Sequence, residues 1–415
     1  MIMNVPHKLR VMNKSLVLNI VREHGRISRA QIASKTNLTR ASVSQIVNDL
    51  LEDNVIYEAG TENSALGRKG IGLEFNRSYG YTLGVDLGGT KISLGLFDFN
   101  GDIMEKETFP TYEVDNSNEF IHLLGNSLLK FMRKHKVADE KLLAIGIASP
   151  GIIDYKNGIV VEGSPNLPEW DSLNLSKEIE KIFDVPTFVE NDVRSALIGE
   201  FWKGKCQGVK SAVLLSLGTG VGSALLIDGH IIRGAGNGAG EVGYFLFNRE
   251  QLNQDWGKEG CLESLISGSG LPKQYDKRRQ MEQSKSNTSP SDGNKDPKSN
   301  HEQVTAKQIF QMAKEGEPIA EELVDEFIDY LCLTILNLIV TVNPEKIVLT
   351  GGLSRSADVF LEKVKEKVNR HTFTQHAVDL EVSNLFDDAA LSGIAILSLN
   401  SLLPDINFMQ DIKIR

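Results

Sequence analysis

A run of small and charged residues between two apolar segments has the composition of a phosphate-binding turn. Gly84-Val85-Asp86-Leu87-Gly88-Gly89-Thr90-Lys91 follows apolar residues that alternate from position 81, and residues 92–97 read as a second strand. Glycines let a ligand approach the backbone of such a turn, whose successive N–H groups can bind an anion. Asp86 could hold a phosphate-bound Mg²⁺, since proteins usually bind this ion through one or two carboxylates. The alternative, an ordinary glycine-rich hairpin, fits these eight residues equally well.

The same pattern returns later in the chain. The apolar run 213–217 leads into Gly218-Thr219-Gly220-Val221-Gly222, and a second apolar run, 224–227, follows. Two strand–turn–strand units facing a common cleft would grip a polyphosphate from both sides, so the repetition favours phosphate binding over the hairpin alternative. Gly351-Gly352 follows a third apolar strand, 346–349, and is a candidate place for a nucleotide base or ribose.

Length and composition indicate two or three globular domains. The chain has 415 residues, 41% of them hydrophobic and 24% charged, and about 150 residues per domain is a common size. Apolar strands alternate with helical stretches after residue 77, which predicts an α/β body. The three cysteines, Cys206, Cys261 and Cys332, are widely spaced, which argues against disulfides and favours a reducing, cytoplasmic location. No apolar run approaches the length of a membrane span, so we expect no membrane partner.

Charge is distributed unevenly along the chain. Residues 1–80 hold 11 Lys and Arg against 7 Asp and Glu, a net of +4, whereas the remainder holds 34 against 48, a net of −14. A basic N-terminal part on an acidic chain indicates that this part alone meets a polyanion.

Residues 1–76, called the head below, have the pattern of a winged helix-turn-helix. An amphipathic helix over 14–24 is followed by helices over 29–36 and 40–53, for which Ser28 and Thr39 are suitable N-caps. A strand at 55–58, a basic tip at 67–70 and a returning strand at 71–75 complete the wing. In this arrangement the second helix of the motif places its N-terminal residues at base edges in the major groove.

An alternative interpretation of the head is a three-helix protein-interaction module with a hairpin. We favour DNA, because helix spacing, polar outer face, basic wing and local charge agree. The residues expected to meet DNA are Ser28, Arg29, Thr39, Arg40, Ser42, Ser44, Gln45, Arg68 and Lys69.

The body resembles a known family, the ROK proteins (repressor, open reading frame, kinase), and the head resembles that of their repressor branch. The resemblance runs from about Lys14 to Leu399. Six motifs carry it in combination: Asp86-Leu87-Gly88-Gly89-Thr90-Lys91, Ser149-Pro150-Gly151, Glu190-Asn191-Asp192, Leu217-Gly218-Thr219-Gly220, Gly238-Ala239-Gly240-Glu241 and Gly260-Cys261-Leu262-Glu263. The family includes xylose and N-acetylglucosamine repressors as well as bacterial glucokinases and fructokinases.

The resemblance implies an α/β fold class in which the winged helix-turn-helix precedes a duplicated ribonuclease-H-like (actin-like ATPase) body of two lobes. The lobes would be residues 77–190, with a C-terminal helix 388–403 packing back on them, and residues 191–387. A sugar would lie in the cleft between the lobes, with Asp192 across that cleft from the first glycine turn.

The resemblance also implies roles for single residues. Asp192 resembles the base that takes a proton from the sugar hydroxyl attacking the γ-phosphate, in a reaction that needs positioning and charge neutralisation. Asp192 also fits a helix N-cap, because it precedes the helical run 193–203, and the two roles can hold at once. The implied sugar contacts are Asn166, Asn191, Asp192, Glu241, Tyr244 and Glu263. The implied nucleotide contacts are Asp86, Gly88, Gly89, Thr90, Lys91, Gly218, Thr219, Gly220, Gly351 and Gly352.

The chain departs from the family pattern at the family's zinc site. Val242-Gly243-Tyr244 stands where an aliphatic residue, glycine and a zinc-binding histidine are usual, and only Cys261 remains of the Cys-x-Cys-Gly-x-x-Gly-Cys run. One ligand of four does not make a tetrahedral zinc site. We therefore expect no zinc, with Tyr244 and Trp256 packing in its place, and Tyr244 offering its hydroxyl to the sugar.

A polar insertion, residues 273–303, is the second departure. It is rich in Ser, Asn, Lys, Asp and Pro, and such a segment cannot bury enough apolar surface to become ordered. We expect a disordered loop.

Two functions follow, and they do not exclude each other. The first is a sugar-responsive repressor of a carbohydrate operon, with xylose metabolism as one option, that binds a partly palindromic operator as a homodimer or homotetramer. The second is an ATP- and Mg²⁺-dependent sugar kinase, indicated by the intact Asp86–Lys91 turn and Asp192. We take repression as primary, because a DNA-binding head has no use in a plain metabolic kinase; DNA binding itself would require no cofactor.

Overall fold

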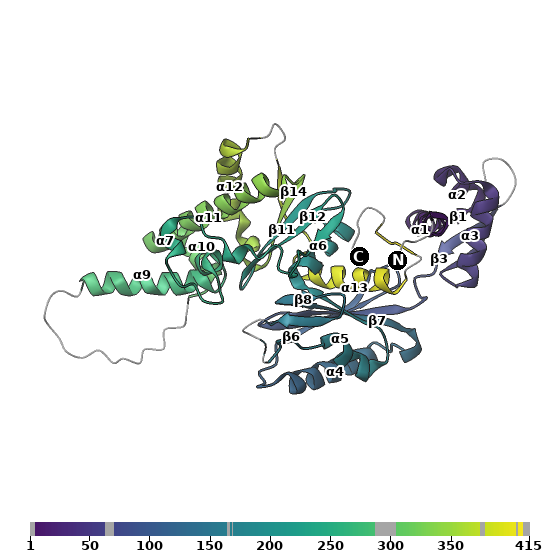
Figure 1. Cartoon of the computed structure of the whole chain (residues 1–415), viewed down its shortest axis with the longest axis horizontal. Helices are drawn as coiled ribbons and strands as arrows, with labels where there is room; N and C mark the ends of the chain where they lie inside the picture. The colour runs from purple at the N-terminus through teal and green to yellow at the C-terminus, as the bar shows by residue number, and fades with distance from the viewer. Residues whose placement is uncertain are drawn as a thin grey trace. The chain divides into compact units, whose positions relative to one another are not determined.

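The computed structural model describes residues 5–62, 70–163, 167, 169–286, 304–373, 378–403 and 406–409. They form two compact units (Figure 1). The first unit joins the chain up to Trp202 to the part from Asp388 onward, and the second is Lys203–Asp387. No helix in the described ranges is both long and apolar enough to cross a membrane.

The head is a three-helix domain with a small antiparallel sheet, and it belongs to the first unit. Its strand order is β1-β3-β2. The elements are α1 (Val5–His24), β1 (Ile27–Ser28), α2 (Arg29–Thr36), α3 (Arg40–Glu52), β2 (Ile56–Glu62) and β3 (Gly70–Phe75). The expected helices at 29–36 and 40–53 are thus present, and β2 continues four residues beyond the expected strand.

The helix-turn-helix forms where capping residues and an apolar stripe coincide. Ser28 and Thr39 cap α2 and α3 through hydrogen bonds from backbone N–H groups, and Asn37 ends α2 in the left-handed conformation at φ 59°. The apolar face of α3 is buried through Val43, Ile46, Val47 and Leu50. This burial fixes which side of α3 faces outward.

The remainder of the first unit is a five-stranded mixed sheet with helices on both faces. Its order is β10-β7-β4-β5-β6, with β10, β7 and β4 parallel and β4, β5 and β6 antiparallel. Helices α4 and α5 cover one face, and α13 covers the other (Figure 1). The elements are β4 (Tyr81–Leu87), β5 (Lys91–Phe97), β6 (Ile103–Pro110), α4 (Ser117–Lys134), η1 (Asp139–Lys141), β7 (Leu142–Ser149), β8 (Ile152–Asp154), β9 (Ile159–Glu162), α5 (Leu175–Phe183), β10 (Thr187–Asn191), α6 (Asp192–Lys203) and α13 (Ala389–Leu402).

Helices α6 and α13 meet at backbone contact. A Cβ placed on Gly393 would lie 1.7 Å from the Ser195 carbonyl oxygen, and one on Gly199 would lie 2.0 Å from the Ala389 carbonyl oxygen. Only glycine allows so close an approach of two helices. Because of this contact, α6 belongs to the first unit, whereas we had expected the second lobe to begin at residue 191.

The second unit repeats the sheet of the first. Its order is β13-β12-β11-β14-β15, and the pattern of parallel and antiparallel neighbours is the same. The elements are β11 (Ala212–Leu217), β12 (Val221–Ile227), β13 (His230–Ile232), η2 (Val242–Tyr244), α7 (Arg249–Leu252), α8 (Cys261–Ile266), α9 (Gly270–Ser286), α10 (Ala306–Lys314), α11 (Pro318–Val342), β14 (Lys346–Thr350), η3 (Gly352–Ser356), α12 (Ala357–His371), β15 (Asp379–Val382) and η4 (Phe386–Asp388).

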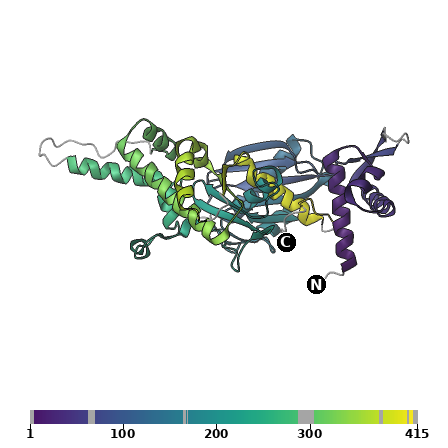
Figure 2. The ribbon, with the colours of Figure 1, turned by 90° about the horizontal axis from the view of Figure 1, so that it is seen from above.

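The polar insertion is partly helical. Residues up to 286 continue α9, which projects away from the rest of its unit (Figures 1 and 2). The expectation of a disordered loop is therefore wrong for residues 273–286. The first turns of α9 are anchored on the second unit. Tyr275 is buried in its core, and Arg278 pairs with Glu322 and Glu326 at 3.3 and 2.6 Å. Residues 287–303 lie outside the described residues.

Candidate functional site

The outward face of α3 is polar and accessible. Thr39, Arg40 and Gln45 are exposed, and Ser42 and Ser44 are half-buried beside them. The Thr39 hydroxyl oxygen accepts a hydrogen bond from the Ser42 N–H at 3.1 Å and lies 2.9 Å from the Ser42 hydroxyl. Arg40 forms no ion pair with any described residue, so its guanidinium is available to a ligand.

Two residues expected to contact DNA have structural partners instead. Ser28 is buried in a capping box, in which its N–H donates to the Gln31 side chain at 2.8 Å and its hydroxyl oxygen accepts from the Gln31 N–H at 3.5 Å. Ser28 is therefore a helix cap rather than an exposed donor. Arg29 donates to Asn48 at 3.3 Å and pairs with Glu58 at 3.5 Å. Arg68 and Lys69, at the expected wing tip, lie outside the described residues.

The first glycine turn joins β4 to β5 as expected. The Gly88 N–H donates to the Lys91 carbonyl at 2.9 Å, and the Thr111 hydroxyl donates to the Gly88 carbonyl at 2.6 Å. A Cβ on Gly88 would lie 2.7 Å from the Lys91 carbonyl oxygen, so the tight turn requires glycine here. Gly89 and Thr90 are at least partly exposed at its tip.

Strand order brings Asp86 and Asp192 to one edge of the first sheet. Asp86 on β4 and Glu190 on β10 both pair with Ala148 of β7, the strand between them. Neighbouring strands are about 4.8 Å apart, so the backbones at 86 and 190 are roughly 10 Å apart. The Asp86 carboxylate thus belongs to the same unit as Asp192, contrary to the expectation that a cleft separates them.

A buried hydrogen-bond network positions Asp192. The Glu190 carboxylate accepts from the Asn191 N–H at 2.9 Å and from Arg194 Nε at 2.8 Å, both buried. The Asn191 amide donates to the Gly151 carbonyl at 3.1 Å and to Asp192 Oδ1 at 3.0 Å. Asn191 is buried and already engaged in these bonds, so in this structure it positions Asp192 rather than offering itself to a ligand.

Removal from water raises the pKa of Asp192 from 3.8 to about 6, although Arg194 and hydrogen bonds from Val193 and Asn191 favour the carboxylate. A carboxyl group near neutrality is suited to accept a proton from a hydroxyl. Perturbed pKa values of this kind are frequent at functional sites.

We expect Asp192→Asn to raise the unfolding temperature of the free protein at pH 7. A raised folded-state pKa makes the folded protein the better proton binder, so this group's contribution to stability falls as pH rises from about 4 to 6. The gain over wild type should be near zero below pH 4 and reach about 3 kcal/mol well above pH 6. Thermal unfolding across this range measures it, with the exposed Asp139→Asn as control. A gain that does not vary with pH would contradict the prediction.

In the second unit, three glycine segments pack together. The Gly218 N–H donates to the Gly220 carbonyl at 3.0 Å, closing the turn between β11 and β12. Gly351 has a φ of 89° and approaches so closely that a Cβ there would lie 2.6 Å from Leu217 backbone atoms. Gly268 donates to the Gly218 carbonyl at 2.8 Å. The structure thus brings Gly218–Gly220 and Gly351 together, as a shared nucleotide site would require.

Glu263 lies directly against this second turn. Its Oε2 accepts from the Val221 N–H at 2.8 Å, and a Cβ on Gly220 would lie 2.4 Å from the same oxygen. Burial raises the pKa of Glu263 above its usual value, although the hydrogen bond from the Val221 N–H lowers it. Glu241 precedes Gly243 by two residues, and a Cβ on Gly243 would lie 3.4 Å from the Glu263 Cβ. The Glu263 carboxylate thus lies on the backbone of the second turn.

Residues 268 and 269 stabilise the turn at Gly218–Gly220, and the sequence did not predict this role. The Ser269 N–H and hydroxyl both donate to the Thr219 carbonyl, at 3.2 and 2.9 Å. The run of small residues just before α9 was the available signal. The remaining expected sugar contact, Asn166, lies outside the described residues.

The Tyr244 hydroxyl donates to the Lys258 carbonyl at 2.7 Å, and the Trp256 indole N–H donates to the Gln251 carbonyl at 2.8 Å. These bonds hold together the loop around Cys261, which corresponds to the zinc site usual in the family. The part of the chain that the structure describes holds no cluster of metal-ligating side chains. The residues present do not fit zinc, and Tyr244 acts as a staple rather than as an offered hydroxyl.

We expect Tyr244→Phe to lower the unfolding temperature by about 2–4 °C, because one hydrogen bond is lost from this staple. Chelation with EDTA should leave the unfolding temperature of the wild type unchanged. Stoichiometric zinc in the purified protein, or a drop in stability on chelation, would contradict this prediction.

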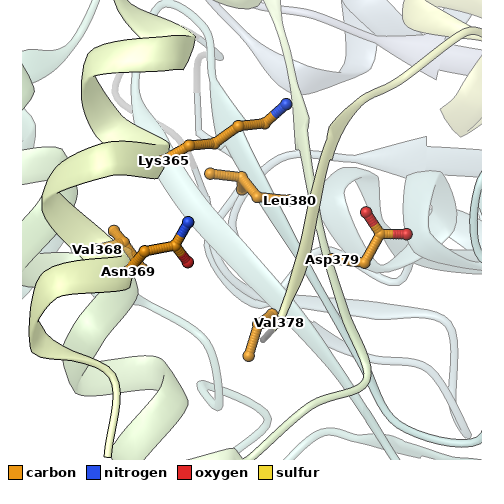
Figure 3. Close-up of a pocket in the computed structure, with 6 residues that line it drawn as sticks. All are labelled: Lys365, Val368, Asn369, Val378, Asp379 and Leu380. Atoms are coloured by element: carbon orange, nitrogen blue, oxygen red, sulfur yellow. The ribbon is translucent and has the colours of Figure 1, made fainter. Parts of the chain in front are cut away.

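A pocket of about 330 Å³ lies between α12 and β15 in the second unit (Figure 3). It is lined by Lys365, Val368, Asn369, Val378, Asp379 and Leu380. None of the residues expected from the sequence lines it, and its lining carries one charge of each sign. We assign it no function.

Two copies of one sheet order, each with a glycine turn between its first two strands, define the actin-like class of α/β bodies, here following a winged helix-turn-helix. The chain belongs to the ROK family, which matches residues 82–401. A winged helix-turn-helix DNA-binding family matches residues 13–57. Both confirm the fold and family expected from the motifs.

Curated relatives include both repressors and kinases. The chain is 30% identical to a xylose repressor of Caldicellulosiruptor bescii over 397 residues, covering 95% of this chain and 97% of the relative. It is 26% identical to the N-acetylglucosamine repressor of Escherichia coli O6:H1, covering 95% of each chain. It is 31% identical to a glucokinase of Halalkalibacterium halodurans over 314 residues, covering 75% of this chain and 92% of the relative. The kinase match thus omits about a quarter of this chain.

Solved structures agree in fold. A ROK family transcriptional regulator, a homologue of the Escherichia coli MLC protein, superposes with a TM-score of 0.78 at 23% identity, covering 97% of this chain and 98% of that one. A ROK glucokinase from Streptomyces griseus in complex with glucose and AMPPNP superposes with a TM-score of 0.62 at 26% identity, covering 77% and 99%.

Proposed function

We propose that this protein is a sugar-responsive transcriptional repressor of a carbohydrate-utilisation operon. One observation carries the proposal: the chain combines a helix-turn-helix head with a ROK body. In the head, α3 presents an accessible polar face. Relatives that share both parts over 95% of this chain are xylose and N-acetylglucosamine repressors.

The DNA interface is the outer face of α3. Arg40 and Gln45 have side chains that can pair with base edges, and Thr39, Ser42 and Ser44 are short donors to phosphate or base. Helix-turn-helix proteins place one recognition helix in each half-site, so the protein acts as a homodimer, or as a homotetramer built from such pairs. Arg68 and Lys69 remain predicted wing contacts.

The effector is a sugar. The polar groups proposed to contact it are the Asp192 carboxylate in the first unit and the Glu241 and Glu263 carboxylates in the second, with Asn166 as a further predicted contact. Carboxylates and amides supply the hydrogen-bond acceptors and donors that a polyhydroxyl ligand requires. For the sugar to release DNA, it must bind the state that is incompetent for DNA more tightly.

The test begins with the purified full chain and a random-sequence DNA library, from which a bound operator is selected. Operator binding is then titrated with D-xylose, D-glucose and N-acetyl-D-glucosamine. We expect one sugar to weaken the operator complex about tenfold or more, within the range of coupling that effectors produce. If no DNA sequence is enriched, or if removing residues 1–76 leaves DNA affinity unchanged, the repressor proposal fails.

A second candidate function, sugar phosphorylation, is favoured by the intact first turn and by Asp192. The turn at Gly88–Thr90 is tight enough to require glycine at position 88, and its N–H groups and Lys91 suit phosphate. Asp86 would hold the Mg²⁺ of bound ATP, and the metal nucleotide would supply the transferred phosphoryl group. Asp192 would take the proton from the attacking hydroxyl.

ADP release with Mg²⁺-ATP and the same three sugars tests this candidate. A sugar-dependent rate that Asp192→Asn abolishes supports a kinase that also represses. Background rates with every sugar would exclude kinase activity toward this panel and leave repression as the function.

A further inference from the structure

The structure contains a direct physical connection between Asp192 and the DNA-binding head. Asp192 is the first residue of α6, and Trp202 stands in its last turn. The guanidinium carbon of Arg22, on α1 of the head, lies 4.4 Å from the centroid of the Trp202 ring. A helix of twelve residues spans about 18 Å, so α6 links the two ends without a flexible segment.

Helix α6 is enclosed on nearly all sides. Every residue from Arg194 to Phe201 is buried, and the glycine contacts described above press α6 against α13 at backbone distance. Close-packed elements transmit displacement rather than absorb it. A shift at the Asp192 end must therefore move α6 and α13 together.

The end of the chain leads from α13 to the same helix of the head. The Phe408 N–H donates to the Asn400 side chain of α13 at 3.1 Å, and the Asn407 N–H donates to the Ser15 hydroxyl of α1 at 2.8 Å. The Asn407 carbonyl accepts from the Asn19 amide at 2.9 Å. The Phe408 ring centroid lies 5.8 Å from the Arg22 guanidinium carbon. Both α6 and α13 thus converge on α1.

The contact surface between α1 and the body is not fully satisfied. Arg22 Nη1 and Asn19 Oδ1 are buried and have no hydrogen-bond partner among the described residues. The side chain of Arg22 is only 10% exposed, and its ion-pair partner Glu23 lies 3.6 Å away. Burial lowers the pKa of Arg22, although Glu23 opposes this. Buried polar groups without partners destabilise the closed contact and so lower the free energy needed to open it.

From this geometry we propose that α6 is the element that carries sugar binding at Asp192 to the head, through the stacking of Trp202 on Arg22. The inference rests on the proposed function, because it explains how the sugar of that proposal releases DNA. When the sugar engages Asp192, α6 shifts with α13, the Arg22 contact opens, and α1 is freed to reposition α3. In the absence of sugar the contact holds α1 in the DNA-binding arrangement.

The stack of Phe75 on Phe99 provides a pivot for this motion. Their ring centroids lie 5.3 Å apart and are nearly parallel, and Phe99 also contacts Phe408 at 5.6 Å. Phe75 ends β3, where the head passes into the body. The head can therefore turn about an aromatic contact that persists while the polar contact at Arg22 opens.

The experiment measures operator affinity with and without the effective sugar, and sugar affinity with and without operator, by calorimetry on the full chain. The probes are the selected operator and D-xylose, D-glucose or N-acetyl-D-glucosamine. In wild type the two ligands should weaken each other by the same factor, about tenfold or more, as linkage requires. Trp202→Ala should reduce both factors to below about threefold. Because the lost contact holds α1 in the DNA-binding arrangement, operator affinity without sugar should fall toward that of the sugar-bound wild type. Trp202→Phe keeps a ring over Arg22 and should retain most of the coupling.

Arg22→Gln provides the second arm and decides the case if Trp202→Ala fails to fold. Arg22→Gln should uncouple the ligands as Trp202→Ala does. Because both residues act through one contact, the double variant should lose no more coupling than either single variant. Wild-type coupling in Arg22→Gln or in a folded Trp202→Ala would overturn the proposal. Failure of the wild type to bind operator, or to release it with sugar, would instead refute the proposed function.

Discussion

Arg40→Ala is expected to weaken operator binding about tenfold to a hundredfold, because a guanidinium that pairs with a guanine edge contributes roughly 1–3 kcal/mol of discrimination. Arg40 stands in the first turn of α3 and is exposed, whereas the neighbouring Arg29 is held by Asn48 and Glu58. The loss should be larger for the operator than for random DNA, and it should become smaller as salt is raised, because the variant releases fewer counterions when it binds.

Titration of operator and random DNA at two salt concentrations measures this effect. Arg133→Ala is the matched control, since it removes an exposed arginine from the first unit far from α3 along the chain. If wild type and Arg40→Ala bound the operator with equal affinity, the prediction that α3 contacts DNA through Arg40 would be wrong. An equal loss on both DNAs would make Arg40 a phosphate contact instead of a base contact.

Gly393→Ala is expected to destabilise the first unit by about 3 kcal/mol, at the upper end of the range for overpacked cores. The added methyl group would meet the Ser195 carbonyl oxygen at 1.7 Å and the Gly199 nitrogen at 2.7 Å. Both are backbone atoms of α6, so no side chain can rotate away. The two helices must separate, and α13 also packs on β7 and β4.

The unfolding temperature should fall by about 6–12 °C, given about 2–4 °C per kcal/mol for a unit of this size. Gly236→Ala is the control, because nothing lies within 4 Å of a Cβ at that exposed loop position. An unfolding temperature equal to that of the control would show that α6 and α13 are not in backbone contact.

Several elements were predictable because their signals are local. Caps and apolar stripes within a few residues predicted α2 and α3, and the glycine turns stood out by composition alone. The repeated strand–turn–strand pattern predicted a duplicated body, and the two sheets have the same strand order. The repressor interpretation depended on the head and the motifs in combination, which are also sequence features.

Other features depend on residues that are far apart in the chain. The polar α9 is helical although its composition predicted disorder, because Tyr275 and Arg278 are anchored on the unit. Ser28 was expected to meet DNA, but the fold buries it. The assignment of α6 to the first unit follows from glycines at 199 and 393, nearly two hundred positions apart.

The sequence by itself determined the family, the two kinds of domain and the residue types at the phosphate turns, since each of these is encoded in short runs of neighbouring residues. Only the tertiary structure decided that Asp86 and Asp192 share one sheet edge, that Asn191 is engaged in positioning Asp192, and that Arg22 stacks on Trp202. Burial and strand order create these relations, and neither is a property of any single segment of the chain.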